Sequence, residues 1–342
     1  MFVIIVLNYA KQAIPQFKGW ICKCLTKGNV KMRNILTVTL SILMVATFTN
    51  INAAEYPNRP ITFMTMVQPG AQIDRLARGL GQRMSKILGQ PINVKNVKGG
   101  HGTVMATELA KSKPDGYTVG ITSLTAYTYA PHHDRLQYKH DDFDFLSLVA
   151  LNSSGFISTP DKPWNTLKEA FEWHKKNDKA MIAMFHGADD RDALKRMAKK
   201  EGVKLSLTPS KGGPSVIRAV TGGHASVGYV GAILYKNVEA GKIKLIASAL
   251  GERLPPIPEV PTLREQGFDE QIEMICALVV PKGLDKSVKA KLLAAANQLA
   301  SDQETQTFIT DNLLMRPVKW GEEVADSTAR KLYADFSMHA SN

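Results

Sequence analysis

Pro60-Ile-Thr-Phe-Met-Thr-Met-Val67 is an apolar run that leads into the glycine-containing loop Gln68-Pro-Gly-Ala-Gln72, and apolar residues recur at helical spacing from about Ile73. The same order returns in Pro91-Ile-Asn-Val-Lys-Asn-Val97, which is followed by Lys98-Gly-Gly-His-Gly102 and a second predicted helix. Repeated strand–loop–helix units predict an α/β fold with a doubly wound sheet. Loops after such strands meet at one edge of the sheet, where unpaired N–H groups at helix N-termini face a ligand. Two such loops side by side predict a site for an anion, most simply a carboxylate.

The composition is that of an ordinary globular protein. The chain has 342 residues, of which 44% are hydrophobic and 22% charged, and this argues against a disordered or membrane-embedded chain. Its length allows two domains of roughly 100–150 residues each. The formal net charge is +12, and residues 1–54 contain six basic and no acidic residues, so +6 remains beyond them. This modest positive balance suits an anionic ligand, and no basic run interleaved with aromatic residues points to nucleic acid.

The N-terminal segment has the layout of a secretory signal. Lys31-Met-Arg-Asn34 is basic, residues 35–48 are apolar, and small residues follow before Glu55. We expect cleavage after Ala53 or Ala54, because the apolar run is short for a membrane span. The residues before the internal methionine of the basic segment are then an upstream extension, and an uncleaved N-terminal anchor is the alternative.

Cysteine usage adds little. Cys22 and Cys24 lie in the segment that we expect to be removed, and the remaining chain keeps only Cys276. A single cysteine cannot form an intrachain disulfide, so we interpret Cys276 as a buried small hydrophobic residue.

Helix and strand patterns suggest a chain that leaves one lobe and later returns to it. We place the first lobe at residues 55–156 and 276–342 and the second at 157–275, with the ligand in a cleft between them. The patterns predict these further elements: strands near 117–122, 143–149, 155–158, 181–185, 203–207, 225–230, 245–249 and 274–280, and helices near 167–173, 190–201, 214–220, 286–301 and 321–338.

Several short motifs occur in a characteristic order. They include Leu88-Gly-Gln-Pro91, Gly99-Gly-x-Gly102, Pro114-Asp-Gly-Tyr-Thr118 and Val260-Pro-Thr262. Together they resemble the extracytoplasmic solute receptors of tripartite tricarboxylate transporters, the Bug family, over residues 55–338. The resemblance implies a periplasmic receptor with a type II periplasmic-binding-protein fold and no cofactor. Such receptors capture small organic acids and pass them to membrane permease subunits or, in some systems, to a sensor protein.

The resemblance also implies a ligand site in the first lobe, where loop N–H groups hold a carboxylate. The first loop keeps Pro69 and Gly70, but Ala71 stands where the family usually has a second glycine. The residues expected to bind are Gly70, Ala71, Gln72, Asp74, Gly100, His101, Gly102, Thr103, Thr122 and Ser123.

The second lobe departs further from the family pattern. A region that is usually rich in glycine and serine, with a histidine before a helix, contains His186-Gly-Ala-Asp-Asp-Arg191 here. The residues that we expect at the far end of the ligand are His186, Gly187, Asp190, Lys211 and Tyr229. Two carboxylates near the site would repel a second acid group on the ligand. We therefore expect a carboxylate at one end of the ligand more firmly than a dicarboxylate.

Other readings of the same residues stay open at this point. Asp74 suits helix capping as well as ligand binding, and Gly100 and Gly102 suit a plain tight turn. His101 suits an exposed loop position as well as a donor to a carboxylate. Neighbouring acids such as Asp189 and Asp190 at a helix start are more typical of capping than of catalysis.

No catalytic or metal site is expected. Adjacent histidines such as His132 and His133 rarely share one metal ion, and Gly223-His-Ala-Ser-Val-Gly228 is one residue too long for a nucleophile elbow. We therefore predict a receptor rather than an enzyme. A periplasmic sensor that feeds a signalling partner and a hydrolase built on the same scaffold are the alternatives.

Overall fold

The computed structural model describes the backbone of residues 55–340 and side chains up to residue 337. The predicted signal segment, its cleavage site, Cys22 and Cys24 lie outside the described residues. None of the helices in the described part of the chain has the length and hydropathy that a membrane crossing requires.

The first sheet is mixed, with strand order β2-β1-β3-β10-β4. Its three parallel strands are adjacent, and β10 runs antiparallel to both β3 and β4. The five strands are β1 (Ile61–Thr65), β2 (Ile92–Asn96), β3 (Thr118–Ser123), β4 (Phe143–Leu151) and β10 (Ile275–Pro281). The sequence patterns had predicted a strand at each of these places, but not the antiparallel insertion of β10.

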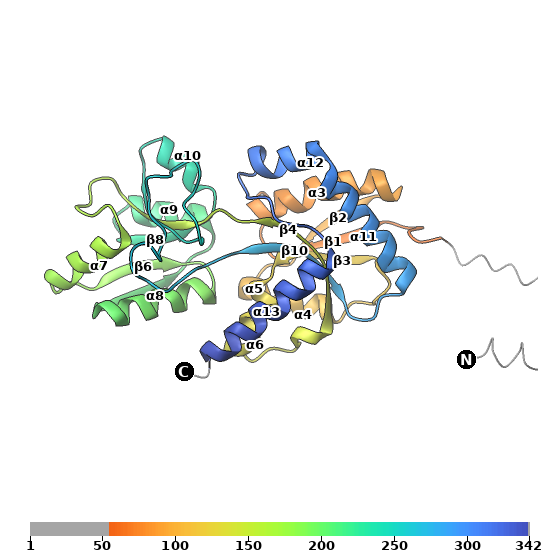
Figure 1. Cartoon of the computed structure of the whole chain (residues 1–342), viewed down its shortest axis with the longest axis horizontal. Helices are drawn as coiled ribbons and strands as arrows, with labels where there is room; N and C mark the ends of the chain where they lie inside the picture. Colours follow the sequence, from red (N-terminus) through yellow and green to blue (C-terminus); the bar gives the residue numbers. More distant parts are fainter. Residues whose placement is uncertain (1–54, 341–342) are drawn as a thin grey trace, which may run out of the picture. The chain divides into compact units, whose positions relative to one another are not determined.

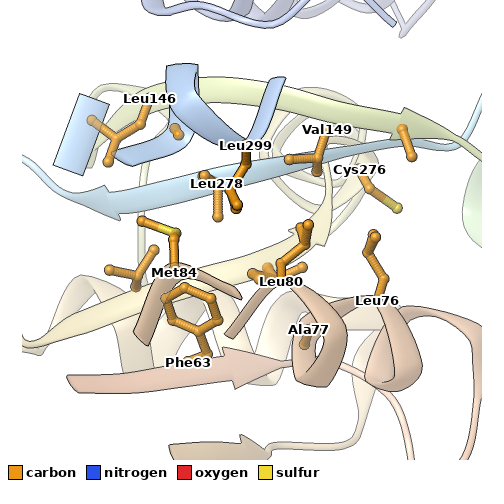
Figure 2. Close-up of a cluster of buried hydrophobic side chains, with 14 of the residues drawn as sticks. Phe63, Leu76, Ala77, Leu80, Met84, Leu146, Val149, Cys276, Leu278 and Leu299 are labelled. Carbon is orange, nitrogen blue, oxygen red and sulfur yellow. The ribbon is translucent and has the colours of Figure 1, made fainter. Parts of the chain in front are cut away.

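Helix α3 (Gln72–Leu88) follows the first strand and shows why the sequence folds this way locally. Leu76, Leu80 and Met84 recur at helical spacing and are fully buried. Gly89 ends the helix in the left-handed conformation and donates its N–H to the Ser85 carbonyl. Figure 2 shows these side chains pointing toward Phe63 of β1 and toward residues of β10, β4 and α11. Each fully buried aliphatic side chain contributes about 1.5–3 kcal/mol to this core.

Further helices flank the first sheet. Among them, α13 packs along β4 and beside α5 (Figure 1). The helical segments are η2 (Gly100–Gly102), α4 (Thr103–Ala110), α5 (Thr125–Thr128), α6 (Ala130–His133), η3 (His140–Asp142), α11 (Lys286–Ser301), α12 (Gln303–Thr307), η4 (Phe308–Asn312) and α13 (Glu322–Ala340).

The second sheet has the order β7-β6-β8-β5-β9 and repeats the same scheme. Its parallel strands β7, β6 and β8 are adjacent, and β5 runs antiparallel to β8 and β9. Its elements are β5 (Gly155–Ser158), α7 (Leu167–Lys176), β6 (Met181–Phe185), α8 (Ala188–Glu201), β7 (Leu205–Pro209), α9 (Gly213–Thr221), β8 (Val227–Val230), α10 (Leu234–Glu239) and β9 (Lys244–Ser248).

The two sheets are the cores of two α/β lobes, as expected. The chain passes from the first sheet to the second between β4 and β5 and returns to the first with β10. β5 already pairs within the second sheet. The exact lobe limits that the sequence suggested, 55–156 with 276–342 and 157–275, stay a prediction.

The buried face of α3 can be tested by truncation. We expect Leu80→Ala to lower the free energy of unfolding by about 2–5 kcal/mol, because it leaves a cavity against β1 and β10. Val104→Ala is the matched control, since Val104 is 47% exposed and a surface change of this kind stays within about 0.5 kcal/mol. Urea denaturation followed by circular dichroism measures both, and equal losses would contradict the packing described here.

Candidate ligand-binding site

The loops after β1, β2 and β3 meet at one edge of the first sheet, because these strands are parallel neighbours. Met66 joins them. A Cβ placed on Gly102 would lie 3.0 Å from the Met66 Sδ atom and 3.1 Å from the Ala126 Cβ atom. The Thr122 hydroxyl lies 3.3 Å from the same sulfur. The two glycine loops and the end of β3 therefore form one packed surface.

Asp74 fixes the first of these loops. Its carboxylate is 1% exposed and accepts hydrogen bonds from the Gly70 N–H at 2.8 Å, the Asn96 Nδ2 at 2.8 Å and the Arg78 Nε at 3.0 Å. Asn96 also donates to the Val67 carbonyl, so the clamp spans the ends of β1 and β2. Burial alone would raise the pKa of Asp74, but the hydrogen bonds from Arg78, Asn96 and Gly70 outweigh it and lower the pKa.

This clamp decides which amides of the first loop remain for a ligand. The Gly70 N–H is committed to Asp74, and the Ala71 N–H points to the Gln68 carbonyl at 3.2 Å. The side chain of Gln72 donates to the Leu313 carbonyl. Helix α3 starts immediately afterwards, with no side-chain cap at Ala71. The N–H groups of its first turn are the ones that face outward from the loop.

The second loop depends on glycine. Gly100 and Gly102 have φ angles of +53° and +103°, which favour glycine. A Cβ on Gly100 would lie only 2.1 Å from the Thr103 hydroxyl oxygen, and that hydroxyl donates back to the Gly100 carbonyl at 2.9 Å. Helix α4 then begins without a side-chain cap. His101 lies at the exposed tip of this loop.

Thr122 and Ser123, at the end of β3, are both buried. The Ser123 hydroxyl donates to the Thr125 hydroxyl at 3.0 Å and accepts from the Thr125 N–H at 3.2 Å. The Ser123 side chain therefore holds the start of α5. The phenol of Tyr127 is buried beside Thr122, and burial raises its pKa.

In the second lobe the loop after β6 carries His186 and Gly187. Both of their N–H groups donate to the Asp190 carboxylate, at 2.6 and 2.5 Å. The Ser210 hydroxyl lies 2.9 Å from the His186 Nδ1 atom and so joins the loops after β6 and β7. The His186 ring lies 6.4 Å from that of Tyr229. These predicted residues come together, whereas Lys211 is exposed on the next loop.

Burial shifts the pKa values of the titratable side chains in this loop of the second lobe. It lowers the pKa of His186 to about 4, with a contribution from His101, so this imidazole is neutral at physiological pH. It raises the pKa of Asp190 well above the ordinary value, and the neighbouring Asp189 raises it further. The pKa of Asp189 is also raised, first by burial. Burial and the neighbouring carboxyl group therefore both disfavour the charged forms of this pair.

Residues of the two lobes approach each other on this side. The Tyr129 phenol, in the segment after β3, donates to the Asp192 carboxylate of α8 at 2.7 Å. His101 lies close enough to His186 for its charge to lower the pKa of His186. Partial burial of the His101 ring and then the Arg191 charge lower the pKa of His101, although its side chain is exposed. The glycine loop of the first lobe thus lies near the acidic loop of the second.

Comparison with known proteins identifies the family. Residues 76–322 match the model of the tripartite tricarboxylate transporter family receptor. The chain belongs to this family. It is 29% identical over 261 residues to the UPF0065 protein in the gbd 5' region of Cupriavidus necator, covering 75% of this chain and 80% of that protein. It is 26% identical over 310 residues to protein BugT of Bordetella pertussis, covering 82% and 93%.

Solved structures agree on the fold. The periplasmic binding protein BugD aligns with a TM-score of 0.73 at 24% identity, covering 83% of this chain and 97% of BugD. A second periplasmic transporter structure gives a TM-score of 0.73 at 26% identity, covering 82% and 96%. The predicted two-lobed α/β fold and the predicted Bug-family membership are both confirmed, and this protein is a solute receptor rather than an enzyme.

Sequence patterns missed several residues in and around this candidate site. Asn96 ties the two first-lobe loops together, Ser154 lies buried near Tyr229, and Tyr129 meets Asp192. A polar residue at the end of a strand, such as Asn96, is a signal that could have been used. The other contacts join residues far apart in the sequence and leave no local pattern.

Two other features lie apart from this site. A cavity of about 380 Å³ is lined by residues that include Trp164, Trp173 and Ser226. Since Ser226 precedes β8, this cavity lies toward the amino ends of the strands, whereas ligands of such sheets bind at the carboxyl ends. His132 lies 2.9 Å from the Tyr333 carbonyl and His133 stacks on Tyr129. In the part of the chain that the structure describes, no cluster of three or more His, Cys, Asp or Glu side chains is placed to hold a metal ion.

The Asp74 clamp predicts a pH-dependent stability. Because the folded-state pKa of Asp74 is lowered, its contribution is present above the ordinary aspartate pKa and is lost as the pH falls through the folded-state value. We expect Asp74→Asn to lower the free energy of unfolding by about 1–3 kcal/mol at pH 7. Urea denaturation from pH 7 downward should show the two proteins converge in acid. A deficit that stays constant with pH would contradict the clamp.

Proposed function

We propose that this receptor binds a small organic carboxylate between its two lobes, with the carboxylate at the edge of the first sheet. One observation carries the proposal. Helices α3 and α4 start at neighbouring loops, and neither has a side-chain cap. Two helix N-termini together offer N–H donors and a favourable dipole to an anion.

The ligands of related structures support this choice. MatC of Rhodopseudomonas palustris, at 23% identity and a TM-score of 0.74, was solved with malate. Another protein of that species, at 18% identity and a TM-score of 0.74, was solved with adipate. Both ligands are small organic acids, in line with a carboxylate for this receptor.

Residues of the first lobe have different roles in holding the carboxylate. Gly70 shapes its loop and gives its N–H to Asp74, so the α3 amides from Gln72 onward are the ones that meet the ligand. Gly102 and Thr103 present the start of α4. At the far end, His186, Gly187, Asp190, Lys211 and Tyr229 contact the remainder of the ligand.

The cellular role follows from the family. We propose that residues 31–54 direct export, with cleavage after Ala53 or Ala54, and that the mature receptor delivers its ligand to the permease subunits of a tripartite transporter. Affinity purification of the tagged receptor from membranes with its ligand present should recover those subunits. Recovery of a sensor protein instead would place the receptor in signalling.

Carboxylate binding is tested by calorimetry with Gly102→Ala. Its Cβ would approach Met66 and Ala126 and strain a positive φ, so we expect affinity for the best acid of a panel to fall at least about tenfold, as for one lost charge-assisted contact.

Gly241→Ala is the matched control, because Gly241 also has a positive φ but has no atom within 4 Å of the added Cβ. It should carry the strain of a side chain at positive φ and keep the affinity. If every acid fails to bind while a sugar binds well, the carboxylate proposal is wrong.

A further inference from the structure

Near the acidic start of α8 lie buried hydroxyl groups that have no hydrogen-bond partner among the described residues. Strands β6 and β8 are parallel neighbours, so the loop after β6 and Tyr229 near the end of β8 lie together. Tyr229 packs in the same core as Ala193 and Leu194 of α8. Its side chain therefore lies on the α8 side of the sheet, below the first turn of that helix.

Two hydroxyls are buried there without partners. Tyr229 is 2% exposed and Ser154 is 0% exposed. Neither oxygen has a hydrogen-bond partner among the residues that the structure describes. The two lie close enough for Ser154 to affect the pKa of Tyr229, but they do not meet hydrogen-bond geometry. A buried hydroxyl without a partner costs about 1–3 kcal/mol, and a ligand that bonds to it removes this cost.

The carboxyl pair beside these hydroxyls lacks a balancing cation. Asp190 accepts the two loop amides, and the Asp189 Oδ1 atom lies 2.5 Å from where a Cβ on Gly187 would be. Asp189 is thus folded over the loop and half-buried. Burial raises the pKa of Tyr229, and the charges of Asp189 and then Asp190 raise it further, which places both carboxyls near the phenol.

The nearby cations are engaged elsewhere or exposed. Arg191 makes two contacts of 2.8 Å with Asp192, and Lys195 adds a third at 3.1 Å. Lys211 is exposed, and His186 is neutral at physiological pH because its pKa lies near 4. Within residues 55–337, no ion pair to Asp189 or Asp190 is formed.

We propose that the far end of the ligand is a primary ammonium group, so that the receptor selects acids with an ammonium at the opposite end over dicarboxylates. An ammonium has three N–H donors, and three acceptors are at hand: the Asp189 carboxylate and the oxygens of Tyr229 and Ser154. A second carboxylate would instead meet like charge. This inference rests on the proposed function, because the carboxylate end of the ligand is the one held by α3 and α4.

Calorimetry on pairs of equal length tests the inference with the unmodified protein. The pairs are 4-aminobutanoate with succinate, 5-aminopentanoate with glutarate, and 6-aminohexanoate with adipate. We expect the best amino acid to bind at least about tenfold more tightly than its diacid, the size of one hydrogen bond to a charged group. A diacid that binds as tightly or more tightly would overturn the inference and leave carboxylate binding intact.

Primary alkylamines separate the two proposals. If amines bind but no acid does, the carboxylate proposal fails and the ammonium site stands. If no acid and no amine binds, both fail.

A variant pair then assigns the preference to the acidic loop. Asp189→Asn should reduce the ratio of amino-acid to diacid affinity at least about tenfold. Asp178→Asn is the matched control, since Asp178 lies in the same lobe, exposed and paired with Lys204, and it should leave the ratio unchanged. An unchanged ratio in Asp189→Asn, with its melting temperature preserved, would overturn the role of Asp189.

Discussion

The site depends on a buried carboxylate that holds a strand–helix loop in place. Asp74 is the third residue of α3, and its oxygens reach back to Gly70 and sideways to Asn96. These bonds fix the loop after β1 against the end of β2, beyond the backbone bond that the Val97 N–H donates to the Thr65 carbonyl. A carboxylate in the first helical turn also interacts favourably with the positive end of the helix dipole. One side chain therefore sets both the loop shape and the direction in which the first α3 amides point.

The second lobe uses the same device with a different charge balance. Asp190 is the third residue of α8 and accepts the amides three and four positions before it. Asp74 has Arg78 beside it, and the net effect lowers its pKa. Asp190 has Asp189 instead, and its pKa is raised. Equivalent positions thus carry opposite pKa shifts, because burial dominates at Asp190, with a carboxyl group beside it, whereas hydrogen bonds from Arg78, Asn96 and Gly70 outweigh burial at Asp74.

Local sequence patterns were enough to predict those features of the fold that depend on residues close together in the chain. The apolar spacing that starts at about Ile73 predicted α3, in which Leu76, Leu80 and Met84 are buried. From the sequence we also favoured helix capping over catalysis for Asp190, and the hydrogen bonds that its carboxylate accepts from two backbone amides confirm the capping role. The features that the sequence did not predict depend on residues far apart in the chain. The antiparallel placement of β5 and β10 depends on pairing between distant segments, and a strand of either direction has the same alternation of side chains.

The same limit applies within the site. From the sequence we placed Gly70 among the anion-binding amides, yet in the structure its N–H donates to Asp74. The sequence left open whether Asp74 caps the helix or binds the ligand, and so it could not predict this contact. The meeting of Tyr129 with Asp192 lay beyond any motif, since it joins the two lobes. This contact bears on the proposed ammonium site. Burial raises the pKa of Asp189, and the charge of Asp192 raises it further, so the residue that meets the first lobe and the residue that we propose to bind the ammonium share one electrostatic environment on α8. A positive group next to Asp189 would stabilise the negative charges of Asp189 and Asp192. The Asp192 carboxylate also accepts the hydrogen bond from the Tyr129 phenol. If the ligand carries the proposed ammonium, its charge and the lobe contact are coupled through the first turns of a single helix.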